Sequence, residues 1–342
     1  MDRPPLPRRV LVTGAAGFIG FHVCRAFLDA GSQVLGIDDL TPYYDPALKQ
    51  ARLDLLKGLD GFDFAPIDIA DGEALLVAFA RFEPEVVIHL AAQAGVRYSI
   101  DNPRAYARSN LDGFLSVLEA CRAHPVGHLV YASSSSVYGA NAKVPFSEHD
   151  GADHPVSLYA ATKRANELMA HSYAQLFGIP ATALRFFTVY GPWGRPDMAY
   201  FKFTKAILEG EPIEVYAESE MSRDFTYVDD VSEAIVRLSG LPPRPDASFD
   251  AADPDPARSK APWRIYNIGN RSPVPLDRFI AAIEQACGAR AIKRHLPMQA
   301  GDVRATFADI SDLEAYAGFR PDTPIETGIA RFVAWYREFY RV

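Results

Sequence analysis

A tyrosine and a lysine near the middle of the chain are spaced to act together. Tyr159 and Lys163 lie in the segment SLYAATK at 157–163, and a separation of four residues puts both side chains on one face of a helix. The pKa of a free tyrosine is about 10, too high for an efficient base at neutral pH, but a neighbouring ammonium group lowers it. The pair predicts acid–base catalysis by Tyr159 with Lys163 tuning it, although the spacing alone also occurs on ordinary helices.

Four consecutive serines precede this helix. They occupy 133–136 and follow the apolar run HLVYA at 128–132, which predicts a strand. Ligands of α/β proteins bind beyond the carboxyl ends of the strands. We therefore expect Ser134 at that edge, where its hydroxyl can share the proton of a reacting group with Tyr159. Taken alone, the serine run is also compatible with a polar loop.

A glycine-rich loop follows the first apolar run. The sequence TGAAGFIG at 13–20 continues from RVLVT at 9–13. Glycines let the chain turn tightly and let backbone N–H groups approach a pyrophosphate at a helix N-terminus. The spacing is GxxGxxG rather than the commoner GxGxxG, but its place between a strand and a helix is the expected one. The loop predicts a dinucleotide site formed by Gly14, Gly17, Phe18, Ile19 and Gly20.

An acidic residue follows the second apolar run. Asp38 stands about 20 residues after the glycine loop, where a carboxylate binds the adenosine ribose hydroxyls of a dinucleotide. Because a carboxylate repels a 2′-phosphate, we expect NAD rather than NADP. Tyr159 and Lys163 would then also lie at the cofactor, with Lys163 able to bond the nicotinamide ribose and the positive nicotinamide helping to lower the pKa of Tyr159. The neighbouring Asp39 is the alternative for this role.

Strand and helix signals alternate through the first half. The predicted strands are 9–13, 33–37, 63–67, 85–90, 128–132 and 181–189, and the predicted helices include 18–30, 73–82, 103–123 and 157–177. Near-continuous apolar strands indicate a parallel sheet covered on both faces. The alternation predicts an α/β fold, a doubly wound parallel (Rossmann) sheet.

The second half is less regular. Its predicted strands are 213–216, 224–228 and 265–268, and its predicted helices are 229–239, 275–287 and 324–341. We expect a cofactor domain at 1–190 and a smaller mixed α/β substrate domain at 191–342, with the chain crossing back near 224–240. The Pro-, Asp- and Ala-rich stretch 241–262 has the composition of an exposed, mobile loop.

Composition excludes several classes of function. The chain has 342 residues and a net charge of −8, which does not favour nucleic acid or an anionic membrane as partner. Its three cysteines, Cys24, Cys121 and Cys287, form no CxxC pair, so we expect no disulfide framework, no metal site and a reduced, cytoplasmic setting. No signal peptide or membrane-spanning run is evident.

Together, the glycine loop, Ser134 and the Tyr159–Lys163 pair resemble the extended short-chain dehydrogenase/reductases that act on nucleotide sugars. The resemblance covers nearly the whole chain and includes HLAAQ at 89–93 and RDFTYVDD at 223–230. It implies further NAD contacts by Asp68, Ile69, Leu90, Ala91, Ala92, Gln93, Asn110 and Phe186. It implies UDP contacts by Arg223, at the diphosphate, and by Val215 and Tyr216, which also fit an ordinary buried strand.

Within that family, three longer stretches resemble the UDP-glucuronate 4-epimerases. They are AQAGVRY at 92–98, SSSSVYG at 133–139 and RFFTVYGPWGRPDM at 185–198. The plant members carry an N-terminal membrane anchor, whereas this sequence resembles a soluble, bacterial-type version. The family also implies a homodimer formed through helices 103–123 and 157–177, whose apolar faces could equally belong to the internal core.

The residues after Ser134 separate the reactions of this family. Dehydratases need an Asp–Glu pair where this chain has Ser135 and Ser136, and decarboxylases carry a glutamate at the second position. Without a carboxylate those acid–base steps have no agent. The remaining reaction is epimerisation at C4 through a ketone, in which NAD takes up hydride and returns it.

A uronic acid substrate requires protection once C4 is oxidised, because the resulting β-keto acid loses CO₂ easily. Hydroxyls and one guanidinium can hold the carboxylate away from the reactive geometry. The candidates are Ser135, Ser136, Thr188 and Arg195. A UDP-glucose/galactose 4-epimerase, a UDP-glucuronate decarboxylase and a non-catalytic NAD-binding protein are the alternatives.

Overall fold

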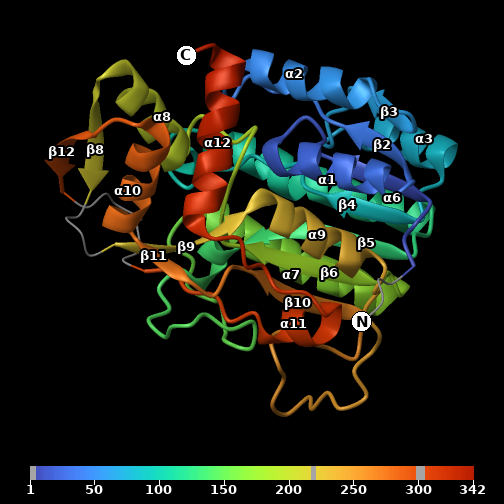
Figure 1. The fold of residues 1–342 in the computed structure, drawn as a ribbon. Coiled ribbons are helices and arrows are strands. Elements are labelled where there is room, and N and C mark those ends of the chain that lie inside the picture. Colours follow the sequence, from blue (N-terminus) through green and yellow to red (C-terminus); the bar gives the residue numbers. More distant parts are fainter. Residues whose placement is uncertain (1–4, 217–220, 298–304) are drawn as a thin grey trace.

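The computed structural model describes residues 5–216, 221–297 and 305–342. Its main strands are β1 (Arg9–Thr13), β2 (Gln33–Ile37), β3 (Phe62–Ala65), β4 (Val86–His89), β5 (His128–Ser134), β6 (Ala181–Phe186) and β10 (Trp263–Ile268). They form one parallel sheet in the order β10-β6-β5-β4-β1-β2-β3 (Figure 1). This order confirms the predicted doubly wound fold.

Helices cover both faces of the sheet, because its strands are apolar on both faces. Along β1, Val10 and Val12 point into one core and Leu11 points into the other. The first core includes α1 (Phe18–Asp29), α9 (Val228–Ser239) and α11 (Ser311–Ala317). The second includes α3 (Gly72–Phe82), α6 (Gly113–Ala123) and α7 (Leu158–Phe177).

A third core lies in the C-terminal part of the chain. Three helices, α8 (Ala199–Glu209), α10 (Leu276–Cys287) and α12 (Ile325–Tyr340), supply much of it. Beside them are a three-stranded sheet of β7 (Thr188–Tyr190), β9 (Ser222–Tyr227) and β11 (Pro273–Pro275) and a pair formed by β8 (Pro212–Tyr216) and β12 (Ile292–Leu296). In Figure 1 this part stands to one side of the main sheet.

The strand predicted at 181–189 is in fact two strands. β6 ends at Phe186 in the main sheet, whereas β7 begins at Thr188 and pairs with β9 in the other sheet. Between them, the backbone N–H of Phe187 donates to the carbonyl of Ile268 at 3.0 Å, at the end of β10. The prediction of one strand was wrong because the apolar run continues while the pairing partner changes.

The helix predicted at 103–123 is interrupted. It consists of α5 (Pro103–Tyr106), a π-helical turn at Ala107–Asp112 and then α6. Such turns insert an extra residue into an α-helix and occur frequently at functional sites. The turn carries Asn110, which is buried.

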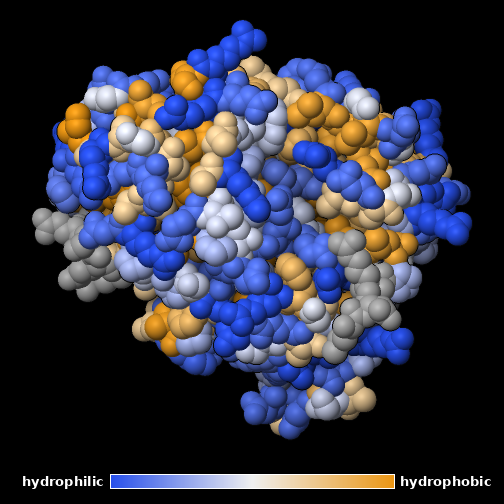
Figure 2. Space-filling model, in the orientation of Figure 1, coloured by the Kyte–Doolittle hydropathy of each residue, from blue (hydrophilic) through white to orange (hydrophobic). Residues whose placement is uncertain are grey.

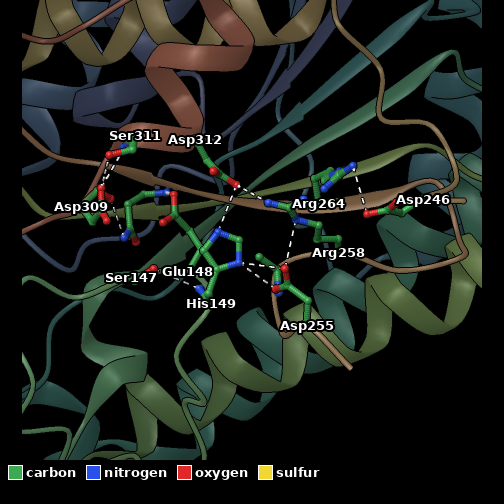
Figure 3. A network of polar contacts seen from close by, with 12 residues as sticks. Ser147, Glu148, His149, Asp246, Asp255, Arg258, Arg264, Asp309, Ser311 and Asp312 are labelled. Carbon is green, nitrogen blue, oxygen red and sulfur yellow. Dashed lines mark hydrogen bonds and ion pairs between the residues drawn. The ribbon is translucent and has the colours of Figure 1, made fainter. Parts of the chain in front are cut away.

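The loop at 241–262 is exposed at its centre and packed at its end. Figure 3 shows the contacts that hold it: Asp255 lies 2.9 Å from Nδ1 of His149 and 3.0 Å from Nε of Arg258. Asp312, from α11, lies 3.3 Å from Nε2 of the same histidine. The end of the loop is thus tied both to the segment before α7 and to α11.

The face shown in Figure 2 mixes hydrophilic and hydrophobic side chains, and the loop at 241–262, lowest in the view, is mostly hydrophilic. None of the helices in the described part of the chain combines the length and hydropathy that crossing a membrane requires.

Candidate active site

A cavity of about 1150 Å³ opens at the carboxyl edge of the main sheet. Its wall includes residues that directly follow β1, β2, β4, β5 and β6, together with residues of α8, β8 and β9. The volume exceeds the roughly 300–1,000 Å³ usual for a single ligand. The cavity is therefore large for a single ligand, and its wall is formed by both parts of the chain.

The glycine loop is built for close backbone approach. Gly14 has φ +74°, and a Cβ atom there would lie 2.7 Å from the backbone nitrogen of Ala91. A Cβ atom at Gly17 would lie 2.9 Å from the carbonyl oxygen of Gly14. No side chain caps the N-terminus of α1, so its first N–H groups can bind an anion. The loop therefore fits the pyrophosphate of a dinucleotide, and Gly14, Gly17, Phe18, Ile19 and Gly20 all line the cavity.

Asp38 is fixed at the end of β2. Its carboxylate accepts hydrogen bonds from the backbone N–H groups of Ala16 at 3.1 Å and Leu40 at 2.8 Å, and the ammonium of Lys49 lies 3.6 Å away. Asp39, by contrast, is exposed. This geometry favours Asp38 over its neighbour as the ribose ligand.

The other expected NAD contacts lie on the same wall, with one exception. Asp68, Ile69, Leu90, Ala91, Ala92, Gln93 and Phe186 line the cavity. Asn110 is 1% exposed and is not among the lining residues that the structure describes. Its side chain accepts from the backbone N–H of Gln93 at 2.8 Å and donates to the hydroxyl of Thr162 at 3.0 Å. It thus joins the loop after β4 to α7.

The structure brings Ser134, Tyr159 and Lys163 together. The side chain of Ser157 caps α7 by accepting from the N–H of Ala160 at 3.1 Å, which places Tyr159 in the first turn. Lys163 donates to the carbonyl of Ala132 at 3.0 Å, and burial lowers its pKa to about 8. All three side chains line the cavity.

The pKa of Tyr159 reflects opposing influences. Burial raises it, whereas a hydrogen bond with Ser134 and the positive charge of Arg195 lower it, and burial prevails. Sequence reasoning had assigned the lowering of this pKa to Lys163 and to the positive nicotinamide of the cofactor, and had not placed Arg195 near the tyrosine. A further positive charge in the cavity would therefore be needed to make Tyr159 an efficient base.

A buried ion pair behind the serines holds α7 against the sheet. Glu167 accepts from Arg185 at 2.8 and 2.9 Å and from the hydroxyl of Ser133 at 2.6 Å. Arg185 lies on β6 and Ser133 on β5, so one carboxylate links three elements. Sequence reasoning missed Glu167, although it lies four residues after Lys163 and therefore on the same helix face.

The guanidinium of Arg195 forms an ion pair with Asp197 at the wall of the cavity. Its Nε and Nη2 atoms lie 3.0 and 2.6 Å from the carboxylate of Asp197, which also accepts from the hydroxyl of Tyr43 at 3.2 Å. The three side chains line the cavity, as do Ser135, Ser136 and Thr188. Sequence reasoning proposed Arg195 but missed its partners; the acidic residue two positions later was the available signal.

Of the three residues expected to contact UDP, two line the cavity and one does not. Tyr216 and Arg223 line the cavity. Val215 does not: its side chain alternates to the other side of β8 and is buried in the C-terminal core. The part of the wall formed by β8 includes Pro212, Glu214 and Tyr216, whose side chains alternate with that of Val215.

The sheet, the glycine loop and the Ser134, Tyr159 and Lys163 constellation define an NAD-dependent enzyme of the nucleotide-sugar class. Residues 10–246 match the NAD dependent epimerase/dehydratase family, and the chain belongs to that family.

Known proteins of this family resemble the chain over nearly its full length. A probable UDP-glucuronate 4-epimerase of Rhizobium meliloti is 53% identical over 334 residues, covering 97% of this chain and 98% of the relative. The UDP-glucuronic acid 4-epimerase of Bacillus cereus, solved with UDP-glucuronic acid and NAD, superposes with a TM-score of 0.84 at 30% identity, covering 97% of this chain and 100% of that one. A UDP-glucose 4-epimerase of Thermotoga maritima, solved with UDP-glucose, gives 0.82 at 28% identity, covering 97% and 99%.

Proposed function

We propose that this protein is a UDP-glucuronate 4-epimerase, an isomerase that interconverts UDP-glucuronate and UDP-galacturonate with NAD and without loss of CO₂. One observation carries the proposal. The cavity presents two hydroxyls, Ser135 and Ser136, and the guanidinium of Arg195 around Tyr159, with no carboxylate at the two serine positions. The similarity to the Rhizobium and Bacillus proteins supports the same substrate.

In the proposed reaction Tyr159 acts first as base and then as acid. As phenolate it takes the proton of the C4 hydroxyl, while Ser134 orients that hydroxyl. NAD, held by the glycine loop and Asp38, would supply the hydride acceptor for C4 and a positive charge that favours the phenolate. Lys163 holds the nicotinamide ribose and adds its own charge. After the keto sugar has turned over, hydride would return to the other face of C4, and Tyr159 returns the proton to the C4 oxygen.

Arg195 and the hydroxyls keep the carboxylate from leaving. CO₂ loss is fast when the breaking C5–C6 bond lies parallel to the carbonyl π orbitals, so the carboxylate must be held in another orientation. Within the described part of the chain, Asp197 takes two of the five N–H donors of Arg195. The other donors, with Ser135, Ser136 and Thr188, bind the substrate carboxylate in this proposal.

The remaining site assignments belong to the same proposal. Residues 1–190 hold NAD, through the glycine loop, Asp38 and the wall residues named above. Residues 191–342 mainly hold the UDP-sugar, with Arg223 at the diphosphate and Tyr216 at the base, and the chain crosses back near 224–240. Asn110 acts indirectly by shaping the loop of Gln93, and Val215 supports the base-binding strand from the core.

We also infer a homodimer working in the cytoplasm. Large apolar side chains on the neighbouring helices α6 and α7 are 43–71% exposed, among them Leu115, Leu168, Leu176 and Phe177. Pairing the same face of two copies would bury them. The three cysteines are free and buried, which suits a reducing compartment.

The decisive experiment compares sugars. The parent protein should convert UDP-glucuronate to UDP-galacturonate far faster than it interconverts UDP-glucose and UDP-galactose. Replacing Arg195 by Ala should weaken UDP-glucuronate binding by roughly 1.5–3 kcal/mol, the value of a charge-assisted hydrogen bond, and should release some CO₂ and UDP-pentose. Arg104→Ala, an exposed residue on α5, is the control. Equal use of both sugars by the parent would refute the uronate assignment.

A further inference from the structure

Arg52 is a buried cation that joins two loops of the cavity. It lies on α2 (Pro46–Lys57) and is 0% exposed. One of its terminal nitrogens donates to the carbonyl of Ala16 at 2.9 Å and to the hydroxyl of Tyr44 at 2.7 Å. The other donates to the carbonyls of Trp193 at 2.6 Å and Gly194 at 3.3 Å. Ala16 belongs to the glycine loop, and the last two residues immediately precede Arg195.

No carboxylate of the described residues lies within ion-pair distance of Arg52. Burying a guanidinium without a counterion costs free energy, and an aliphatic side chain would fill the same space without that cost. An aliphatic side chain, however, cannot bind three carbonyls and a hydroxyl at once, whereas the planar guanidinium fork is suited to it. The arginine therefore contributes a fixed geometry between the two loops rather than a salt bridge.

The second of these loops needs external support. Trp193 has φ +60°, a left-handed conformation that is strained for a bulky residue. Its ring packs against Phe21 of α1 and Trp335 of α12, with ring centroids 5.5 and 5.1 Å apart. Arg52 fixes its carbonyl. The backbone that leads into Arg195 is thus held from three helices.

The segment before α2 holds the same loop at its other end. Tyr43 donates to Asp197, the partner of Arg195. Tyr43 also lies close to Gly95, where a Cβ atom would be 2.9 Å from its hydroxyl and 3.9 Å from Nη2 of Arg195. The guanidinium of Arg195 is thereby confined between Gly95 and Asp197.

We propose that Arg52 is a positioning residue of the reaction: it locks the loop at 193–197 to the glycine loop, and so keeps the guanidinium of Arg195 beside Tyr159. The identity of the substrate group that Arg195 binds rests on the proposed function, but its position relative to Tyr159 does not.

This coupling has a measurable signature in the pH dependence. The groups that face Tyr159 are Ser134, Tyr106, Lys163 and Arg195, and the last of these lowers the tyrosine's pKa. If Arg195 moves away, the pKa of Tyr159 rises. Because Tyr159 must be deprotonated to act as base, the acidic limb of the rate profile then shifts to higher pH.

The test uses Arg52→Lys, which keeps the charge but not the planar fork. With saturating NAD and whichever UDP-sugar the parent turns over, its acidic limb should shift upward by about one unit, a tenfold loss of rate on that limb. The protein as purified should also contain less NAD than the parent. Leu56→Ala, which removes a buried side chain of the same helix, should lower stability but leave the limb and the NAD content unchanged.

A double-mutant cycle separates positioning from general damage. If Arg52 acts through Arg195, combining Arg52→Lys with Arg195→Met should shift the limb no further than Arg195→Met alone. An unshifted limb in Arg52→Lys, or shifts that add fully in the double variant, would overturn the proposal.

Should Arg52→Lys not fold, Tyr44→Phe is the deciding variant. It removes one acceptor of the guanidinium and should shift the acidic limb in the same direction by less. The absence of any shift would refute the coupling. The sugar preference of the parent, measured separately, reports only on the proposed function.

Discussion

At the scale of single residues, burial of the Tyr159 phenol is opposed by one hydrogen bond, with Ser134, and by one positive charge, that of Arg195. Burial raises the pKa of Tyr159 and lowers that of Lys163 to about 8, so each group is pushed towards its neutral form. Arg195 and Ser134 act in the opposite direction on the tyrosine. The pKa of Tyr159 is therefore set by its neighbours, and in the proposed reaction its function depends on their positions.

Replacing Tyr159 by Phe tests the acid–base assignment. The change removes the hydroxyl and keeps the ring, so epimerisation should fall by at least about 10²-fold, the usual scale for the loss of a general base. The glycine loop is untouched, and NAD content after purification should equal that of the parent. Turnover within a few-fold of the parent would contradict the assignment.

Asp38 should decide the choice of cofactor. Its carboxylate is fixed at the end of β2, where it would repel a 2′-phosphate. NADP should therefore reactivate the parent apoprotein poorly, and Asp38→Asn should narrow the difference between NAD and NADP. Asp39→Asn, at the exposed neighbour, serves as control and should leave reactivation by NAD and by NADP unchanged. Equal reactivation of the parent by both cofactors would show that Asp38 is not the ribose ligand.

At the scale of elements, the sequence predicts the strands of the main sheet within a few residues, because hydrophobic periodicity reports burial. It does not predict α2, whose pattern is mixed and whose buried face includes Lys49 and Arg52. Because periodicity reports only local burial, it also could not identify the partners of Arg195. Tyr43 and Asp197 meet across 154 positions of sequence, and no local pattern records a contact at that distance.

The charged network around the loop at 241–262 should affect how the stability of the protein depends on pH. Burial opposes the charging of His149, but Asp255 and Asp312 outweigh it and raise its pKa. Burial also raises the pKa of the neighbouring Glu148 to about 7. Each folded pKa thus exceeds its unfolded value, so these two groups bind more protons in the folded protein, and their contribution to the free energy of unfolding falls as pH rises from about 5 to 8.

Thermal unfolding measured across that range checks the network (Figure 3). Over that range the melting temperature of His149→Gln should fall less with rising pH, or rise more, than that of the parent, because the variant lacks the contribution of His149. His154→Gln, at an exposed histidine of the same segment, is the matched control and should follow the parent. An identical slope in the parent and in His149→Gln would show that the network does not contribute.

At the scale of the whole molecule, the exposed apolar face of α6 and α7 is the surface through which we expect two copies of the chain to associate. Leu168 and Leu176 are two turns apart on α7 and are 56% and 71% exposed. Leu168→Glu should convert the proposed dimer into a monomer, because a charge at such an interface is left without a counterion. Light scattering after size exclusion measures the change. Leu55→Glu, at an exposed leucine of α2, should leave the dimer intact, and a monomeric parent would refute the assignment.

The join between the two sheets sets how the catalytic cycle can proceed. A single residue, Phe187, separates β6 from β7, and α9 follows β9 without an intervening loop. Hinges need residues that absorb large changes of backbone angle. The connection at Phe187 and the direct join of β9 to α9 offer almost none. The two walls of the cavity therefore have little freedom to move relative to each other at these connections, and in the proposed reaction the sugar, rather than the protein, turns over between its two faces. An epimerase of this construction should keep working when its large-scale motions are frozen out, as in a crystal lattice or a stiff sugar glass.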